Sequence, residues 1–192
     1  MNPFAQPQRT GSLLRDLPCE WFICGGWAID LFLNRLTREH KDIDIAIARD
    51  DQFRARGFLG QRGWRLEKAI NGELIPWADD QWLALPVHGV WCRNEGHDPD
   101  FIELLLNEID DTQFRFRRDE SITLPRERMS FRSASGLPVL APEIVLLYKS
   151  NCREEDEADF GNAAGSLSEG SRVWLKAALR KLFAGHPWAD KL

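Results

Sequence analysis

The stretch Gly25-Gly26-Trp27-Ala28-Ile29-Asp30, with Lys41-Asp42-Ile43-Asp44-Ile45 a short distance further along the chain, decides the fold. The first part predicts a tight glycine turn that leads into a helix. The second part places two carboxylates one residue apart in an alternating apolar run, which is typical of a strand. Because successive side chains of a strand point to opposite faces, Asp42 and Asp44 share one face and the isoleucines share the other.

Two aspartates held side by side repel each other unless a cation neutralises them. Magnesium prefers oxygen ligands from one or two carboxylates, completed by the phosphates of a substrate. A glycine pair between a strand and a helix leaves backbone N–H groups free beside the helix N-terminus, which suits a phosphate. Each signal alone is weak. The order of strand, glycine pair, helix and acidic strand in one compact unit is stronger evidence, because it brings an anion site and a cation site together.

The bulk properties are those of a globular protein without a membrane segment. With 192 residues, 43% hydrophobic and 29% charged, the chain suits one domain or a main domain with a small appendage. No run has the length of a membrane helix, and residues 1–10 lack the plan of a signal peptide. The net charge of −5 argues against an extended nucleic-acid surface, although a small basic phosphate pocket remains compatible with it.

Cysteine usage favours a reducing compartment. The chain has few cysteines, irregularly spaced: Cys19, Cys24, Cys92 and Cys152. This pattern does not resemble a disulfide framework, so we expect a cytoplasmic protein.

Periodicity predicts further elements around the opening motif. A buried strand over Glu20–Cys24 precedes the glycine turn, and the helix after it should stop at Asn34, which tolerates the left-handed conformation. Asn71-Gly72 is a strong two-residue hairpin signal. The remaining predicted pieces are a helix over 51–59 and strands over 64–69, 73–77, 83–91, 101–106, 114–117, 121–124 and 129–131.

The C-terminal part changes character and becomes helical. Pro142 opens an apolar helix that runs to residue 150, and Ser168 caps a last amphipathic helix over 173–183. The acidic run Glu154–Asp159 is interpreted as a solvated segment, with Asp156 or Asp159 as alternative partners for Lys149. We expect an α/β (α+β) core over residues 1–135 and a helical extension packed on it over residues 136–192.

The opening motif, extended by Thr37-Arg38-Glu39-His40, resembles that of the polymerase-β-like nucleotidyltransferase superfamily. The similarity is greatest to the small bacterial aminoglycoside and lincosamide nucleotidyltransferases. It is specific over residues 22–47 and loose elsewhere, and Asn34 stands where the pattern usually has glycine. The resemblance implies a mixed twisted sheet with flanking helices. It also implies a glycine turn that holds a nucleoside triphosphate, an Asp-x-Asp pair that binds magnesium, and a third carboxylate on a later strand.

Glu103 is the first candidate for that third carboxylate. It is the only charge inside the apolar run 101–106, so burying it without a partner would be costly. We assign it as third metal ligand and possible general base, although the related proteins more often have aspartate there. Asp100 is the alternative, and an ion pair with an arginine is the purely structural interpretation of Glu103.

Two basic residues are candidates for the triphosphate, beside Gly25 and Gly26. Lys149 ends the Pro142 helix and resembles a lysine that contacts the triphosphate in related enzymes; Arg38 lies between the turn and the acidic strand. Asp30 also matches the motif, but we assign it a structural ion pair with Arg35 or Arg38.

The resulting hypothesis is a nucleotidyltransferase that uses two magnesium ions and moves AMP from ATP, or another nucleoside monophosphate, onto a hydroxyl of a small aminoglycoside-like molecule. Asp42, Asp44 and Glu103 would form the metal and catalytic site. Two alternatives stay open. One is a nucleotidyltransferase of a toxin–antitoxin or defence pair that acts on a protein; the other is a catalytically silent nucleotide-binding regulator. The oligomeric state is not predicted.

Overall fold

The computed structural model describes residues 2–151 and 153–192, so Cys152 lies outside the described residues. The strands, in chain order, are β1 (Trp21–Cys24), β2 (Asp44–Ala48), β3 (Arg65–Ile70), β4 (Glu73–Pro76), β5 (Gly89–Arg93), β6 (Phe101–Ile109), β7 (Gln113–Phe116), β8 (Asp119–Pro125), β9 (Ser130–Arg132) and β10 (Pro138–Leu140). The α-helices are α1 (Ala5–Leu13), α2 (Gly25–Leu33), α3 (Gln52–Gly60), α4 (Pro142–Tyr148), α5 (Glu154–Ala163), α6 (Glu169–Leu182) and α7 (Pro187–Lys191).

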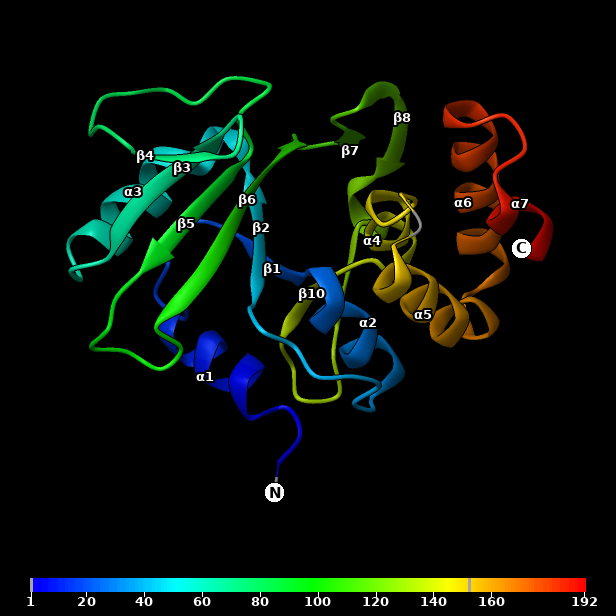
Figure 1. Ribbon diagram of the computed structural model, residues 1–192, viewed down its shortest axis with the longest axis horizontal. Helices are drawn as coiled ribbons and strands as arrows, with labels where there is room; N and C mark the ends of the chain where they lie inside the picture. Colours follow the sequence, from blue (N-terminus) through cyan, green and yellow to red (C-terminus); the bar gives the residue numbers. More distant parts are fainter. Residues whose placement is uncertain (1, 152) are drawn as a thin grey trace.

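A mixed sheet forms the centre, with the order β4-β3-β5-β6-β2-β1-β10-β9 and with β7 and β8 continuing from β6. Strand β2 runs parallel to β6 and antiparallel to β1, and β10 runs parallel to β1. Helices α4 to α7 gather at one end of the molecule, and the β3–β4 hairpin with α3 lies at the other (Figure 1). The predicted mixed α/β fold is therefore confirmed.

The opening unit folds as its pattern predicts, except at the start of β2. Ile43, Ile45 and Ile47 are fully buried, and burying each such side chain contributes about 1.5–3 kcal/mol. Helix α2 ends at Asn34, whose φ of 50° is left-handed. The β3–β4 hairpin turns at Asn71 and Gly72, with φ of 51° and 83°. These are the positive values that a two-residue turn of this kind requires.

Two predicted strands begin at least two residues later in the structure than the sequence pattern indicates. The strand predicted over 83–91 begins only at Gly89. Before it, Arg49 donates to the carbonyls of Leu83 and Val87 at 2.8 Å, and the Gln52 side chain accepts from the Leu83 N–H at 2.7 Å. Side chains thus satisfy backbone groups that a sheet ladder would otherwise use.

Strand β2 likewise begins at Asp44, so placing Asp42 inside the strand was wrong. The Asp42 carbonyl accepts from the Trp27 indole at 3.1 Å instead of from a neighbouring strand.

The C-terminal part contains one strand and two helices that were not predicted from the sequence: β10, α5 and α7. Strand β10 has only three residues and begins with a proline, so it has almost no pattern of its own; pairing with β1 makes it a strand. The sheet therefore continues to Leu140, while the division of the chain at residue 135 stays a prediction. Helix α7 follows the helix that was predicted as the last one, and Ser168 caps α6 by accepting from the Ser171 N–H.

The acidic run was wrongly interpreted as solvated. It forms α5, in which Asp156 and Asp159 are fully buried while the glutamates at the helix start are exposed. No described helix is both long enough and apolar enough to span a bilayer.

Candidate active site

Three carboxylates converge where β2 and β6 begin. Asp44 lies directly opposite Glu103 in the parallel pair, and the Glu103 N–H donates to the Ile43 carbonyl at 3.1 Å. Asp42 reaches the same place from the loop before β2. Each residue offers an oxygen within 4.8 Å of the others. Asp100, the alternative third carboxylate, is exposed at the start of β6 and does not belong to this group.

The site holds its negative charges at an electrostatic cost. Burial, and then the negative charges of Glu103 and Asp42, raise the pKa of Asp44 to about 7. The positive charges of Lys149 and Arg38 oppose this rise in part. Burial and Asp42 also raise the pKa of Glu103, against a hydrogen bond from Trp91. Carboxylates gathered in this way are a good donor set for a hard divalent cation, which relieves both the repulsion and the desolvation.

The glycine turn packs directly against this acid cluster. Gly25 has a φ of 61°, and any Cβ there would overlap the Asp44 carboxylate. At Gly26 a Cβ would overlap the Arg38 guanidinium and come within 2.8 Å of the His40 ring. Gly25 therefore needs glycine for its conformation and for space, whereas a side chain at Gly26 would displace Arg38 and His40.

The two predicted phosphate-binding cations are held by the buried acids of α5. Lys149 Nζ lies 3.0 Å from Asp156 Oδ1 and 2.8 Å from Asp159 Oδ2. Arg38 makes a two-pronged contact with Asp159, at 3.1 and 3.2 Å. Burial alone would lower the pKa of Arg38, but the hydrogen bonds and charge of Asp159 raise it above its usual value. The proposed alternative pairing of Lys149 is thus confirmed, with both aspartates taking part.

Asp30 has the structural role expected of it, but with other partners. Its carboxylate accepts from His40 Nε2 at 2.7 Å and from the N–H and hydroxyl of Thr37, rather than pairing with Arg35 or Arg38. His40 also stacks on Trp27, with ring centroids 4.2 Å apart. The loop between α2 and β2 is fixed by these contacts, because Asp30 and His40 are both buried.

The sequence pattern did not point to His40 or Arg153, which line the site. Both belong to a cleft of about 510 Å³ that also contains Gly26, Arg38, Lys149 and the three acids. Arg153 binds Asp156 through Nε at 2.9 Å. Its spacing of three residues before Asp156 at the start of a helix was the available signal. For His40, the signal was its position two residues before Asp42.

Comparisons with known proteins identify relatives of this chain. A family model described as aminoglycoside-2''-adenylyltransferase matches residues 9–119. A 2''-aminoglycoside nucleotidyltransferase of Klebsiella pneumoniae is 29% identical over 84 residues, which is 44% of this chain and 45% of that protein. The same values hold for one of Escherichia coli. The alignment thus spans somewhat less than half the length of the curated relatives.

Solved structures extend the likeness in fold to most of the chain. ANT(2'')-Ia in complex with adenylyl-2''-tobramycin is 16% identical, with 92% of this chain and 97% of that chain covered and a TM-score of 0.60. The lincomycin-bound lincosamide adenylyltransferase LnuA is 17% identical, with 84% and 96% covered and a TM-score of 0.59. At these identities the likeness shows the fold alone.

The sheet and its acid cluster thus define a nucleotidyltransferase fold, and the resemblance in residues 22–47 is confirmed. Because the family model covers more than half of the chain, the chain belongs to the aminoglycoside-2''-adenylyltransferase family.

Proposed function

We propose that this protein is a magnesium-dependent adenylyltransferase that moves AMP from ATP onto a hydroxyl of an aminoglycoside-like antibiotic. The observation that carries the proposal is the convergence of Asp42, Asp44 and Glu103 beside the turn at Gly25 and Gly26. A structural ion-pair network would match carboxylates with cations, whereas none of these three acids forms an ion pair within the described part of the chain. Membership of the family supports the reaction class.

Each side chain has a defined task in this scheme. Asp42, Asp44 and Glu103 would hold the magnesium ions, which neutralise phosphate charge when bound. Arg38 and Lys149 would face the triphosphate, with Asp159 keeping both side chains extended toward it. Glu103 would also accept the acceptor's proton, because a raised pKa makes a carboxylate a better base near neutral pH.

Arg153 extends the cationic side of the cleft, and His40 lines the cleft beside Gly26. Because Asp30 accepts the hydrogen bond from His40 Nε2, the Nδ1 edge of the His40 ring faces Gly26. That edge lies where the phosphate would pass over the glycine turn. Glu39 and Glu155 line the outer part of the same cleft, and such acidic groups suit a polycationic sugar.

The test is transfer of label from α-phosphate-labelled ATP onto a panel of aminoglycosides and lincosamides, with magnesium present. Asp44→Asn should abolish transfer while circular dichroism stays unchanged. Asp100→Asn is the matched control, because Asp100 is exposed at the start of the same strand as Glu103. Undiminished transfer in Asp44→Asn would refute the assignment. Binding of ATP with magnesium but no transfer to any acceptor would favour the silent regulator instead.

A further inference from the structure

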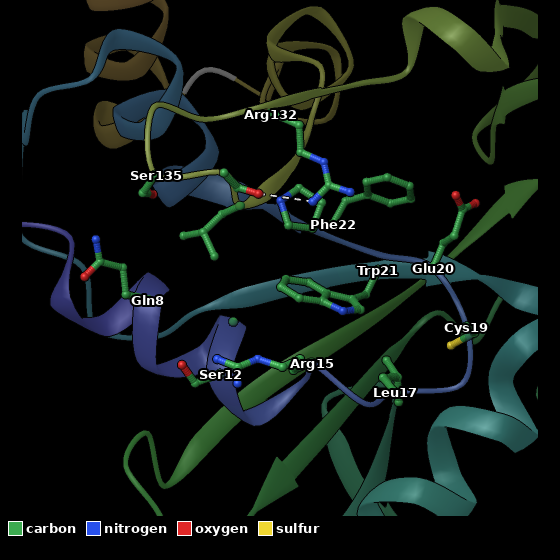
Figure 2. Close-up of a pocket in the computed structure, with 14 residues that line it drawn as sticks. Gln8, Ser12, Arg15, Leu17, Cys19, Glu20, Trp21, Phe22, Arg132 and Ser135 are labelled. Atoms are coloured by element: carbon green, nitrogen blue, oxygen red, sulfur yellow. Dashed lines mark hydrogen bonds between the residues drawn. The ribbon is translucent and has the colours of Figure 1, made fainter.

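A second cleft, of about 550 Å³, lies away from the acid cluster. Helix α1, the segment 15–22 and the turn between β9 and β10 form its walls, and the indole of Trp21 lies between Arg15 and Arg132 (Figure 2). Its volume is in the range of small-ligand sites. None of the residues that line it lines the cleft of the three carboxylates.

The register of β1 separates the two clefts. Trp21 pairs with Ile47 at one end of the strand, and Cys24 pairs with Asp44 at the other. Because side chains alternate along a strand, Trp21 shares its face with Ile23, opposite to the face that carries Cys24 and Asp44. The two clefts therefore lie at opposite ends of β1.

The second cleft has an excess of positive charge in a protein whose net charge is −5. Within residues 2–151 and 153–192, neither Arg15 nor Arg132 forms an ion pair, and Arg132 donates only to the Gly136 carbonyl, at 3.1 Å. Glu20, the acidic residue of the lining, is already paired with Arg126. Two guanidinium groups are thus available to an anion, and their planar donor sets match phosphate oxygens.

The aromatic group between them is built into the fold. Trp21 is half-buried on a strand, and Gly11 of α1 leaves room for Leu137, since a Cβ there would overlap that side chain. Helix α1 and the β9–β10 turn are thereby held together over the indole. A rigid, partly exposed indole beside arginines is suited to stacking with a nucleobase.

We propose that this cleft is a second site for a mononucleotide, separate from the acid cluster. The base would stack on Trp21, and the guanidinium groups of Arg15 and Arg132, which flank the indole, would supply the positive charge for the phosphate. The Ser12 and Ser135 hydroxyls, at the rim of the same cleft, offer hydrogen bonds to the sugar. Binding there needs no divalent cation, because the arginines supply the charge.

The test is calorimetric titration of the full chain with AMP in EDTA, which removes the metal that the acid cluster would use. AMP should bind with a stoichiometry of one, and adenosine or inorganic phosphate alone should bind more weakly. Arg15→Gln and Arg132→Gln should each weaken AMP binding at least about tenfold. Trp21→Leu should weaken it about tenfold, and Trp21→Phe should largely retain it.

Two controls separate this site from the surface and from the acid cluster. Arg9→Gln removes another exposed guanidinium of α1, which pairs with Asp98 outside the cleft, and should leave AMP binding unchanged. Asp44→Asn should also leave it unchanged. Absence of AMP binding at millimolar concentration, or equal binding by the Arg15→Gln/Arg132→Gln double variant, would overturn the proposal. Oligoadenylate that binds increasingly tightly with length would also overturn it, in favour of a nucleic-acid strand.

Discussion

Replacing Asp44 by asparagine should stabilise the metal-free protein while it destroys the site. Asp44 lies opposite Glu103 and beside Asp42, and burial together with these two charges raises its pKa from 3.8 to about 7. An ionised Asp44 is therefore less favourable in the folded chain than in the unfolded chain. Asparagine keeps the shape of the side chain and removes that charge.

The magnitude follows from proton linkage. Between about pH 4 and pH 7 the folded protein holds a proton on Asp44 that the unfolded chain has released, so the free energy of unfolding falls as the pH rises. One pH unit corresponds to about 1.4 kcal/mol, which gives an upper limit of about 4 kcal/mol at pH 8. Asp44→Asn should recover most of this difference at pH 8 and little of it below pH 4.

The assay is urea denaturation in EDTA at several pH values between 4 and 8. The difference in unfolding free energy between Asp44→Asn and the wild type should grow with pH. Asp100→Asn should change stability by no more than about 0.5 kcal/mol at any pH, because its side chain is exposed. A variant that is less stable than the wild type at pH 8 would refute the reasoning.

Magnesium supplies the second arm of the same experiment. A cation that binds only the folded protein should stabilise the wild type by about 2.7 kcal/mol at a hundred times its dissociation constant. It should therefore remove much of the pH dependence in the wild type and have no effect on Asp44→Asn. Equal stabilisation of both proteins would mean that the cation binds elsewhere.

Three other substitutions test the supporting structure. Asp159→Asn removes the carboxylate that Arg38 and Lys149 share. It should lower the free energy of unfolding by about 3 kcal/mol and raise the KM for ATP about tenfold. An unchanged KM would contradict the positioning role of Asp159. Gly25→Ala should reduce transfer more than about 100-fold, measured by label transfer, because the new Cβ displaces the facing aspartate. Asn34→Ala should destabilise by about 1 kcal/mol in thermal unfolding while Asn34→Gly does not, since the φ of 50° is strained for alanine.

The opening unit was predictable because its signals are local. Alternation of apolar and acidic residues determines which face of β2 is buried, and a glycine pair or an asparagine at a helix end reflects backbone conformation at that residue. The hairpin at Asn71-Gly72 belongs to the same class. These features depend on neighbours within a few positions of the chain.

Elements with little pattern of their own were decided by the rest of the molecule. Strand β10 exists because β1 offers it a partner, and residues 83–88 stay irregular because Arg49 and Gln52 take their backbone groups. The residues of β10 and residues 83–88 carry no sequence pattern that indicates these contacts, because their partners are distant in the sequence.

The sequence by itself determined the acid pair and its glycine turn. It also made Glu103 the first candidate for the third carboxylate, because an isolated charge in a buried strand needs a partner. The structure decided between Glu103 and Asp100 by bringing Glu103 to the pair. Only the tertiary structure decided what holds the cations. An acidic run on a helix is usually solvated, but packing of α5 against α4 and α2 buries Asp156 and Asp159 and directs them at Lys149 and Arg38. Burial depends on which face of a helix meets the core, and that is a property of the assembled fold.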